Sequence, residues 1–317
     1  MEQKGNADRF EQAAELLPQR LRRLALALPE HRKERAEELR LRTQRPMTVL
    51  TDEGELSVAA ADRDALVTAA DLEQMIASLT EYSRYASMET LRRGYLAVRG
   101  GFRLGVCGSV VLRDGAPYNL KDFSGLALRI VRERIGLAAE VTEKLFDERG
   151  AFLSTLILSP PGGGKTTLLR DAIRCLSLGS EAHPALRVAV IDERSEIAVS
   201  CGGCAQTELG PHTDVLDGCP KAIGIPMVLR AMNPQVIAVD EITAAPDIAA
   251  ICAAAHCGVG LLATIHADGT DELRRKPLYR ALLEEGVFRR AVVIERKDGA
   301  RRYLTETLEC CAPPAER

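Results

Sequence analysis

The sequence contains no tryptophan, and only six phenylalanines and six tyrosines occur among its 317 residues. Proteins that bind single-stranded nucleic acid stack the bases on aromatic side chains, so this scarcity argues against such a function. Positive charge is not in excess either, because the formal net charge is −3. Such a chain has no overall attraction to nucleic acid or to anionic lipid. Either partner would have to bind a local basic patch.

Long apolar segments are also absent from the sequence. No stretch reaches the roughly 18 uninterrupted apolar residues of a membrane-spanning helix. Residues 1–5 continue into polar sequence without the apolar core of an export signal. These features predict a cytoplasmic protein that is at most peripheral to a membrane.

The nine cysteines are expected to be reduced thiols, because the cytosol keeps thiols reduced and the count is odd. Four potential zinc ligands lie near one another in the sequence, namely Cys201, Cys204, His212 and Cys219. The first two have the C-x2-C spacing of zinc sites, but the other spacings match no zinc pattern. Unligated thiols are therefore the favoured interpretation.

The chain is long enough for two domains, and its pattern changes near the middle. Residues 1–140 indicate a small α+β domain, with short strands at 39–42 and 47–50, a helix at 66–79 and a glycine-punctuated hairpin at 95–112. Residues 126–146 have a helical period and contain the expected boundary. A second domain is expected over residues 141–317.

The second domain alternates short apolar runs with helices, which is typical of a mostly parallel α/β sheet. The runs at 155–158, 187–191, 236–239 and 261–265 lack polar alternation, as strands covered on both faces should. Helices are expected at 166–176 and 246–256. The predicted fold class is therefore α/β with a smaller N-terminal α+β domain.

A glycine-rich loop follows the first of these runs. Its sequence, SPPGGGKTT at residues 159–167, fits the phosphate-loop motif G-x4-G-K-[ST] except that Ser159 replaces the first glycine. Glycines let successive backbone amides face phosphate oxygens, the lysine reaches the β and γ phosphates, and the hydroxyl ligates magnesium. We therefore expect a P-loop ATPase with ATP and Mg²⁺ as cofactors. The expected nucleotide-binding residues are Pro161, Gly162, Gly163, Gly164, Lys165, Thr166, Thr167, Thr264 and His266.

Acidic residues end two of the predicted strands. Asp240 ends the run at 236–239 and is expected to hold Mg²⁺ together with Thr166. The adjacent Glu241 is placed to polarise the attacking water. Lys165 is also expected to be a catalytic residue. Glu193, in the acidic cluster at 192–196, competes with Glu241 for the role of base, and both assignments stay open.

Four separated stretches resemble the stage III sporulation protein AA family, the ATPases of the sporulation apparatus in endospore-forming bacteria. They are GGFRLGVCG at 100–108, SPPGGGKTTLLRD at 159–171, DERSEI at 192–197 and TDVLDGCPK at 213–221, within a resemblance that spans about residues 39–296. Ser159 itself occurs in the loop of that family. The family is similar to the ATPases of type II and type IV secretion and of pilus motors.

The resemblance implies a RecA- or AAA+-like core and a homohexameric ring at the mother-cell face of the membrane. It also implies partners among the membrane proteins of the stage III channel. From their position at the end of the last predicted strand, either Thr264 or His266 is expected to sense the γ-phosphate. Ring ATPases complete each site with an arginine from the neighbouring subunit. The candidates, each with a surface ion pair as its alternative role, are Arg103, Arg129, Arg194 and Arg230.

Three functions are consistent with these observations. The leading hypothesis is an ATP-hydrolysing ring motor that powers a sporulation secretion channel. The second is a nucleotide-gated assembly scaffold with little turnover. The third is an ATPase that depends on single-stranded nucleic acid, which the charge balance and the sparse aromatics disfavour.

Overall fold

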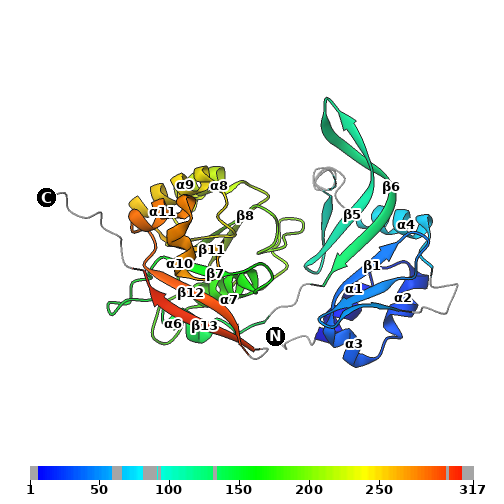
Figure 1. Cartoon of the computed structure of the whole chain (residues 1–317), viewed down its shortest axis with the longest axis horizontal. Coiled ribbons are helices and arrows are strands. Elements are labelled where there is room, and N and C mark those ends of the chain that lie inside the picture. Colours follow the sequence, from blue (N-terminus) through cyan, green and yellow to red (C-terminus); the bar gives the residue numbers. More distant parts are fainter. Residues whose placement is uncertain are drawn as a thin grey trace. The chain divides into compact units, whose positions relative to one another are not determined.

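The computed structural model describes residues 6–58, 66–80, 91, 94–130, 134–297 and 300–308. The chain divides into two compact units (Figure 1). The first consists of Met1–Arg132 and Val199–Gln206, and the second of Glu133–Ala198 and Thr207–Arg317. The sequence pattern contains no sign that residues 199–206 join the first unit. The predicted division into an N-terminal α+β domain at 1–140 and an ATPase domain at 141–317 stays a prediction.

The first unit is a six-stranded antiparallel sheet with helices, in the strand order β3-β2-β1-β6-β5-β4. Its core holds Phe10 and Leu21 of the helices against Leu39, Leu104 and Leu128 of the strands. Its elements are α1 (Asn6–Ala14), α2 (Gln19–Leu26), α3 (Glu30–Arg35), β1 (Ala36–Arg42), β2 (Thr48–Thr51), β3 (Gly54–Ser57), α4 (Ala69–Thr80), β4 (Tyr95–Val98), β5 (Phe102–Arg113) and β6 (Ala116–Arg129).

The helical interpretation of residues 126–146 is wrong over its first part. Leu126 and Leu128 are buried while Arg129 is exposed, which is the two-residue period of a strand. These residues pair with β1 on one side and β5 on the other, and such pairing overrides a local charge pattern. Residues 131–133 lie outside the described residues, and the helix that follows, α6, covers only Ala139–Glu143.

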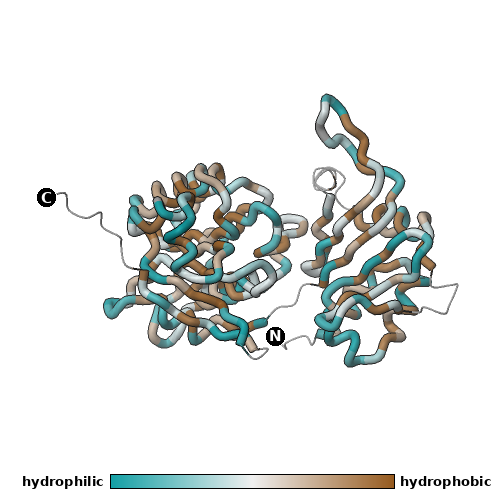
Figure 2. Tube along the Cα trace, viewed as in Figure 1, coloured by the Kyte–Doolittle hydropathy of each residue, from teal (hydrophilic) through white to brown (hydrophobic). Residues whose placement is uncertain are grey.

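The hairpin of β5 and β6 extends well beyond its neighbouring strands (Figure 1). β4 pairs with β5 only up to Gly105, and β1 pairs with β6 only from Gly125 onward. The projecting ribbon contains hydrophobic segments, which are brown in Figure 2. Val110 and Leu112 of β5 are 54% and 63% exposed. The hairpin predicted at 95–112 is confirmed as β4 and β5, whereas the strand β6 that extends it was not predicted.

The second unit contains a seven-stranded sheet in the order β13-β12-β7-β11-β10-β8-β9. All its pairs are parallel except that of β12 with the edge strand β13. The mostly parallel sheet and the four predicted strands are confirmed; β9, β12 and β13 were not predicted. The elements after α6 are β7 (Thr155–Ser159), α7 (Lys165–Leu178), β8 (Val188–Asp192), β9 (Thr213–Asp217), α8 (Lys221–Ala231), β10 (Val236–Val239), α9 (Ala245–His256), β11 (Gly260–His266), α10 (Thr270–Arg275), α11 (Pro277–Glu284), β12 (Arg290–Lys297) and β13 (Ala300–Thr307).

Helices cover both faces of this sheet, so its strands are apolar without alternation. Leu156 and Leu158 of β7 enter the core shared with α8, α9 and α11, whereas Ile157 between them enters the core shared with α6 and α7. The buried Asp171 of α7 accepts the N–H groups of Gly136 at 3.1 Å and Ala138 at 2.6 Å, which fixes the turn before α6. Among the described residues, no helix is both long and apolar enough to cross a bilayer.

Candidate functional site

The strand order brings the predicted site segments to one edge of the sheet. β7, β11, β10 and β8 are consecutive neighbours, and all four are parallel. The segments at or after their carboxyl ends hold the glycine-rich loop, His266, the Asp240–Glu241 pair and the acidic cluster. Ligands of open α/β sheets bind at this edge.

The glycine-rich loop has a backbone that only glycines adopt easily. Gly162 has a φ of 74° and Gly164 a φ of 104°, both in the left-handed region. A Cβ on Gly163 would lie 2.2 Å from Oγ of Ser159, so the loop closes tightly on its own first residue. α7 begins at Lys165 and no described side chain caps its first turn. Uncapped amides above a glycine loop fit the phosphates of a nucleotide.

Lys165 lies inside this loop. Its Nζ donates to the carbonyl oxygens of Ser159 at 2.9 Å and Pro160 at 3.2 Å, and lies 2.6 Å from Nδ1 of His266. Burial lowers the pKa of the lysine, although the nearby carboxylates of Glu241 and Asp240 act to raise it. A desolvated cation held among acceptors in a loop is suited to exchange those acceptors for phosphate oxygens.

Glu241 continues this line of contacts through His266. An ammonium group has no acceptor, so Nδ1 of His266 accepts from Lys165 and the ring carries its proton on Nε2. That nitrogen lies 3.3 Å from Oε1 of Glu241, and Oε2 of Glu241 lies 3.7 Å from Nη1 of Arg194. Residues from the loop, β11 and the segments after β10 and β8 thus form one polar chain.

Asp240 is fixed by the strand beside it. Thr264 in β11 is fully buried, and its hydroxyl donates to Oδ1 of Asp240 at 3.0 Å. The Thr264 hydroxyl, expected to sense a γ-phosphate, is therefore engaged in orienting the carboxylate expected to hold Mg²⁺. Thr166 stands at the start of α7, partly exposed. Hydroxyl and carboxylate oxygens are ligands that suit Mg²⁺.

Glu193 has a different partner from Glu241. Its carboxylate forms an ion pair with Nζ of Lys221, the first residue of α8, whose side chain is only 5% exposed. Glu193 also follows β8, which lies one strand further from the loop strand than β10 does. Of the two carboxylates considered as base, only Glu241 contacts His266 in the described contacts.

Comparison with known proteins identifies the family. The sequence profile of the family described as "Sporulation stage III, protein AA" matches residues 7–305, almost the whole chain. The chain belongs to this family. Stage III sporulation protein AA of Bacillus subtilis strain 168 is 35% identical over 286 residues, covering 90% of this chain and 91% of that protein. The resemblance seen in the sequence is confirmed.

Solved structures show the fold of this sporulation stage III AA chain. The ATPase DotB of Legionella pneumophila superimposes with a TM-score of 0.56 at 19% identity, covering 86% of this chain and 77% of that one. The pilus retraction motor PilT, solved with bound ADP, has a TM-score of 0.57 at 18% identity, covering 87% and 80%. The chain therefore has the P-loop NTPase fold seen in these two ATPase structures.

The first residue of the family's DERSEI stretch shapes the loop beside the site. Asp192 is fully buried, and its carboxylate accepts the N–H groups of Glu196 at 2.8 Å, Ile197 at 2.9 Å and Ala198 at 2.7 Å. Burial raises its pKa to about 6, against the opposing effect of those three donors. These three hydrogen bonds to Asp192 fix the backbone that follows the acidic cluster at 192–196.

Replacing Asp192 with asparagine is expected to change how stability depends on pH. The wild-type carboxyl has a pKa of about 6 when folded and 3.8 ordinarily, so the unfolded chain ionises first as pH rises. This group therefore lowers the free energy of unfolding by about 3 kcal/mol between about pH 4 and pH 6. The variant lacks that decrease, which urea unfolding followed by circular dichroism at about pH 4 and pH 7 measures.

An Asp147→Asn variant serves as the control of opposite sign. The N–H of Ala151 holds the pKa of Asp147 low, so its ionised form stabilises the fold above the ordinary carboxyl pKa. The Asp147→Asn variant should therefore have a lower free energy of unfolding than wild type at neutral pH, and this difference should shrink as the pH falls. The same pH dependence in wild type and Asp192→Asn would contradict the assignment for Asp192.

The four candidate arginines lie in different environments. Arg103 stacks on the ring of Tyr95 at 4.2 Å, and Arg129 lies 3.8 Å from Glu38, both within the first unit. Arg230 is exposed in the last turn of α8, and Arg194 contacts Glu241. The choice of an arginine that acts on a neighbouring subunit stays a prediction.

Arg301 is a site residue that the sequence did not indicate. A Cβ on Gly164 would lie 3.2 Å from its Cζ and 3.3 Å from its Nε, so the guanidinium of β13 packs directly on the glycine-rich loop. The antiparallel pairing of β12 with β13 brings it there from the far end of the chain. No local motif marks such a residue.

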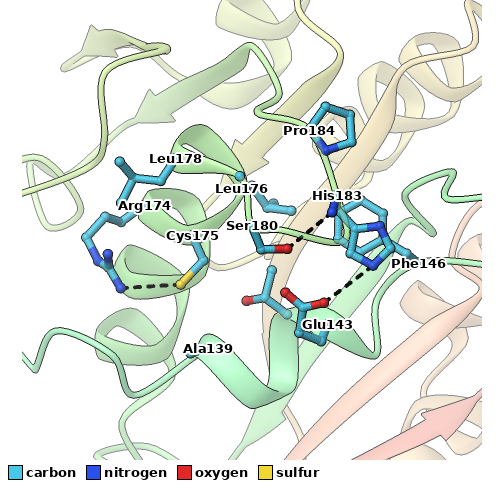
Figure 3. A pocket seen from close by; sticks show the side chains of 12 residues that line it. Ala139, Glu143, Phe146, Arg174, Cys175, Leu176, Leu178, Ser180, His183 and Pro184 are labelled. Carbon is cyan, nitrogen blue, oxygen red and sulfur yellow. Dashed lines mark hydrogen bonds and ion pairs between the residues drawn. The ribbon is translucent and has the colours of Figure 1, made fainter.

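A cavity of about 210 Å³ lies at the other end of α7 (Figure 3). The rings of Phe146 and His183 stack there with centroids 3.8 Å apart, and Oε2 of Glu143 lies 3.5 Å from Nε2 of His183. Arg174 and Cys175 also line it. Because the glycine-rich loop is at the amino end of α7, this cavity is separate from the candidate nucleotide site.

The possible zinc ligands do not form a cluster. Over the ranges that the structure describes, no three His, Cys, Asp or Glu side chains are grouped so that they could hold a metal. Cys201, Cys204 and Cys219 are free thiols. His212 uses its ring near the end of α7, where Nδ1 lies 2.9 Å from the carbonyl of Ser177.

Proposed function

We propose that this chain is a Mg²⁺-dependent ATPase that works as a ring and supplies energy to a membrane channel of sporulation. The observation that carries the proposal is the polar chain from Lys165 through His266 to Glu241, set against a glycine-rich loop at the carboxyl edge of a parallel sheet. A cation, a relay and a carboxylate in contact beside such a loop support phosphoryl transfer to water as the function.

The residues would act as follows. Mg-ATP supplies the phosphoanhydride bond and a metal that neutralises its charge. The amides of Gly164 and of the first turn of α7 would bind phosphate oxygens, whereas the N–H of Gly163 donates to the carbonyl of Pro160 at 3.1 Å. Lys165 would exchange the carbonyls of Ser159 and Pro160 for phosphate oxygens, while Thr166 and Asp240 would hold the metal. Glu241, freed from its contact with His266, would accept a proton from the attacking water.

Ring assembly is proposed from the likeness to secretion and pilus ATPases and from the family. A homohexamer at the mother-cell face of the membrane would bind membrane proteins of the stage III channel. Arg194 is half exposed beside Glu241, so it is available to a neighbouring subunit as well as to its own site. An arginine at such a boundary couples hydrolysis to subunit movement.

The purified chain tests the proposal through two measurements. Steady-state phosphate release with Mg-ATP reports turnover, and molecular mass in solution with a nonhydrolysable ATP analogue reports assembly. We expect turnover and a nucleotide-dependent shift to a sixfold mass. Assembly without turnover would favour the scaffold, and turnover that requires added DNA or RNA would favour the nucleic-acid ATPase. Failure to bind Mg-ATP at millimolar concentration would refute all three.

Replacing Arg301 with alanine is expected to weaken ATP binding roughly tenfold, because the guanidinium beside Gly164 adds positive charge next to the phosphate loop. Lysine at the same position should lose less, since it keeps the charge without the planar fork. Arg302→Ala is the matched control, as the next residue of β13 points to the opposite face. Titration with a fluorescent ATP analogue measures the affinities, and equal affinity in wild type and Arg301→Ala would remove Arg301 from the site.

A further inference from the structure

Cys201 and Cys204 lie opposite each other in a tight turn. They form an isolated antiparallel bridge in which the N–H of Cys201 donates to the carbonyl of Cys204 at 2.9 Å, and the N–H of Cys204 donates back at 3.1 Å. Residues that exchange both backbone bonds have Cα atoms about 5.5 Å apart, within the roughly 4.4–6.8 Å that a disulfide spans. The backbone pairing therefore fits the Cα spacing of a disulfide.

The residues between the cysteines hold this geometry. Gly202 has a φ of 59° and Gly203 a φ of 79°, and a two-residue turn with positive φ at both central positions is the one that closes antiparallel strands. A Cβ at either glycine would meet nothing within 4 Å. The glycines are needed here for backbone conformation alone, which makes the turn easy to perturb without a steric clash.

Both thiols are unbonded and open to reagents. Cys204 is exposed and Cys201 is partly exposed. In the described ranges the pair belongs to no group of metal ligands, so zinc does not account for it. Two free and accessible cysteines on opposed backbone positions are a dithiol that can be oxidised within the chain.

We propose that Cys201 and Cys204 form a reversible intramolecular disulfide when the surrounding thiol pool becomes oxidised. The more exposed Cys204 thiolate attacks a low-molecular-weight disulfide, RSSR, forming a mixed disulfide and releasing one thiolate. The Cys201 thiolate then attacks the sulfur of Cys204, which forms the Cys201–Cys204 bond and releases the second thiolate. The protein loses two electrons and two protons, and RSSR is reduced to two thiols.

The turn is connected to a conspicuous glycine motif of the first unit. Nε2 of Gln206 donates to the carbonyl of Cys204 at 3.1 Å, and Oε1 of Gln206 accepts the N–H of Gly100 at 2.8 Å. A Cβ on Gly101 would come within 3.2 Å of Gln206. A disulfide that fixes the turn therefore also fixes the side chain that covers Gly100 and Gly101, the start of the GGFRLGVCG stretch.

The full-length chain, equilibrated with glutathione and glutathione disulfide, tests the proposal. Peptide mass mapping should show a Cys201–Cys204 peptide lighter by two hydrogens. The internal disulfide should be favoured at least about tenfold more in the folded chain than in the same chain in urea, because the turn raises the effective concentration of the two thiols. Hydrogen exchange of the Gly100 amide should slow on oxidation.

Two variants complete the experiment. Gly203→Ala strains the turn without a steric clash. In this variant the folded chain should favour the internal disulfide little more than the same chain does in urea. A Cys107→Ser/Cys257→Ser double variant removes two other exposed thiols and should leave it unchanged. Glutathione retained on Cys204, or an internal disulfide no more favoured when the chain is folded than in urea, would overturn the proposal. Neither outcome depends on ATP turnover.

Discussion

Lys165→Ala is expected to reduce ATP turnover at least about a hundredfold. The side chain lies inside the glycine-rich loop, where its Nζ contacts the carbonyl oxygens of Ser159 and Pro160 and Nδ1 of His266. Losing a preorganised donor to a developing negative charge typically costs about two to three orders of magnitude. Phosphate release under saturating Mg-ATP measures the loss.

The controls for Lys165 separate charge from folding. Lys144→Ala removes an exposed lysine after α6 and should leave turnover unchanged. Lys165→Arg keeps the charge but not the compact ammonium group, so it should recover little activity. Circular dichroism should show that all three variants are folded. Turnover in Lys165→Ala equal to that of wild type would refute the assignment of the phosphate site.

Glu241→Gln is expected to retain ATP binding while turnover falls by about two to four orders of magnitude, the range for loss of a general base. The amide oxygen of glutamine can still accept from Nε2–H of His266, so the polar chain persists while its basic end is lost. A fluorescent ATP analogue measures binding, and single-turnover phosphate release measures the chemical step. Tight binding with stalled release is the expected combination.

Glu193→Gln is the matched substitution for the competing carboxylate. Because Glu193 is paired with Lys221, its change should leave the chemical step within a few fold of wild type while loosening the contact between the acidic loop and α8. The reverse result, in which Glu193→Gln stalls turnover and Glu241→Gln does not, would exchange the two roles.

The strands and the loop of the second unit were readable from the sequence because their causes are local. Uninterrupted apolar runs mark strands buried on both faces, and the interval from Ser159 to Lys165 is a contiguous motif followed by an amphipathic helix. The error at residues 126–146 has the opposite cause. There the strand exists because β1 and β5 pair with it. The residues that pair with Leu126 and Leu128, namely Leu39 and Leu41 of β1 and Leu104 and Val106 of β5, are distant from them in sequence.

Contacts between distant segments could not be predicted from the sequence either, because they depend on how separate strands and turns pair. Arg301 reaches Gly164 only because β13 folds back along β12 at the edge of the sheet. Cys201 and Cys204 were recognised as a pair, but their opposition depends on a turn backbone that composition does not define. Residue type thus indicated chemistry, while the partner of each residue depended on topology.

The sequence by itself determined the family and the P-loop fold, because both rest on contiguous motifs. Only the tertiary structure decided which carboxylate contacts His266, the partner of Lys165. β11 lies between β7 and β10, so His266 stands between Lys165 and Glu241, whereas β8 carries Glu193 one strand further away. Strand order is set by the packing of the whole sheet, and no local pattern encodes it.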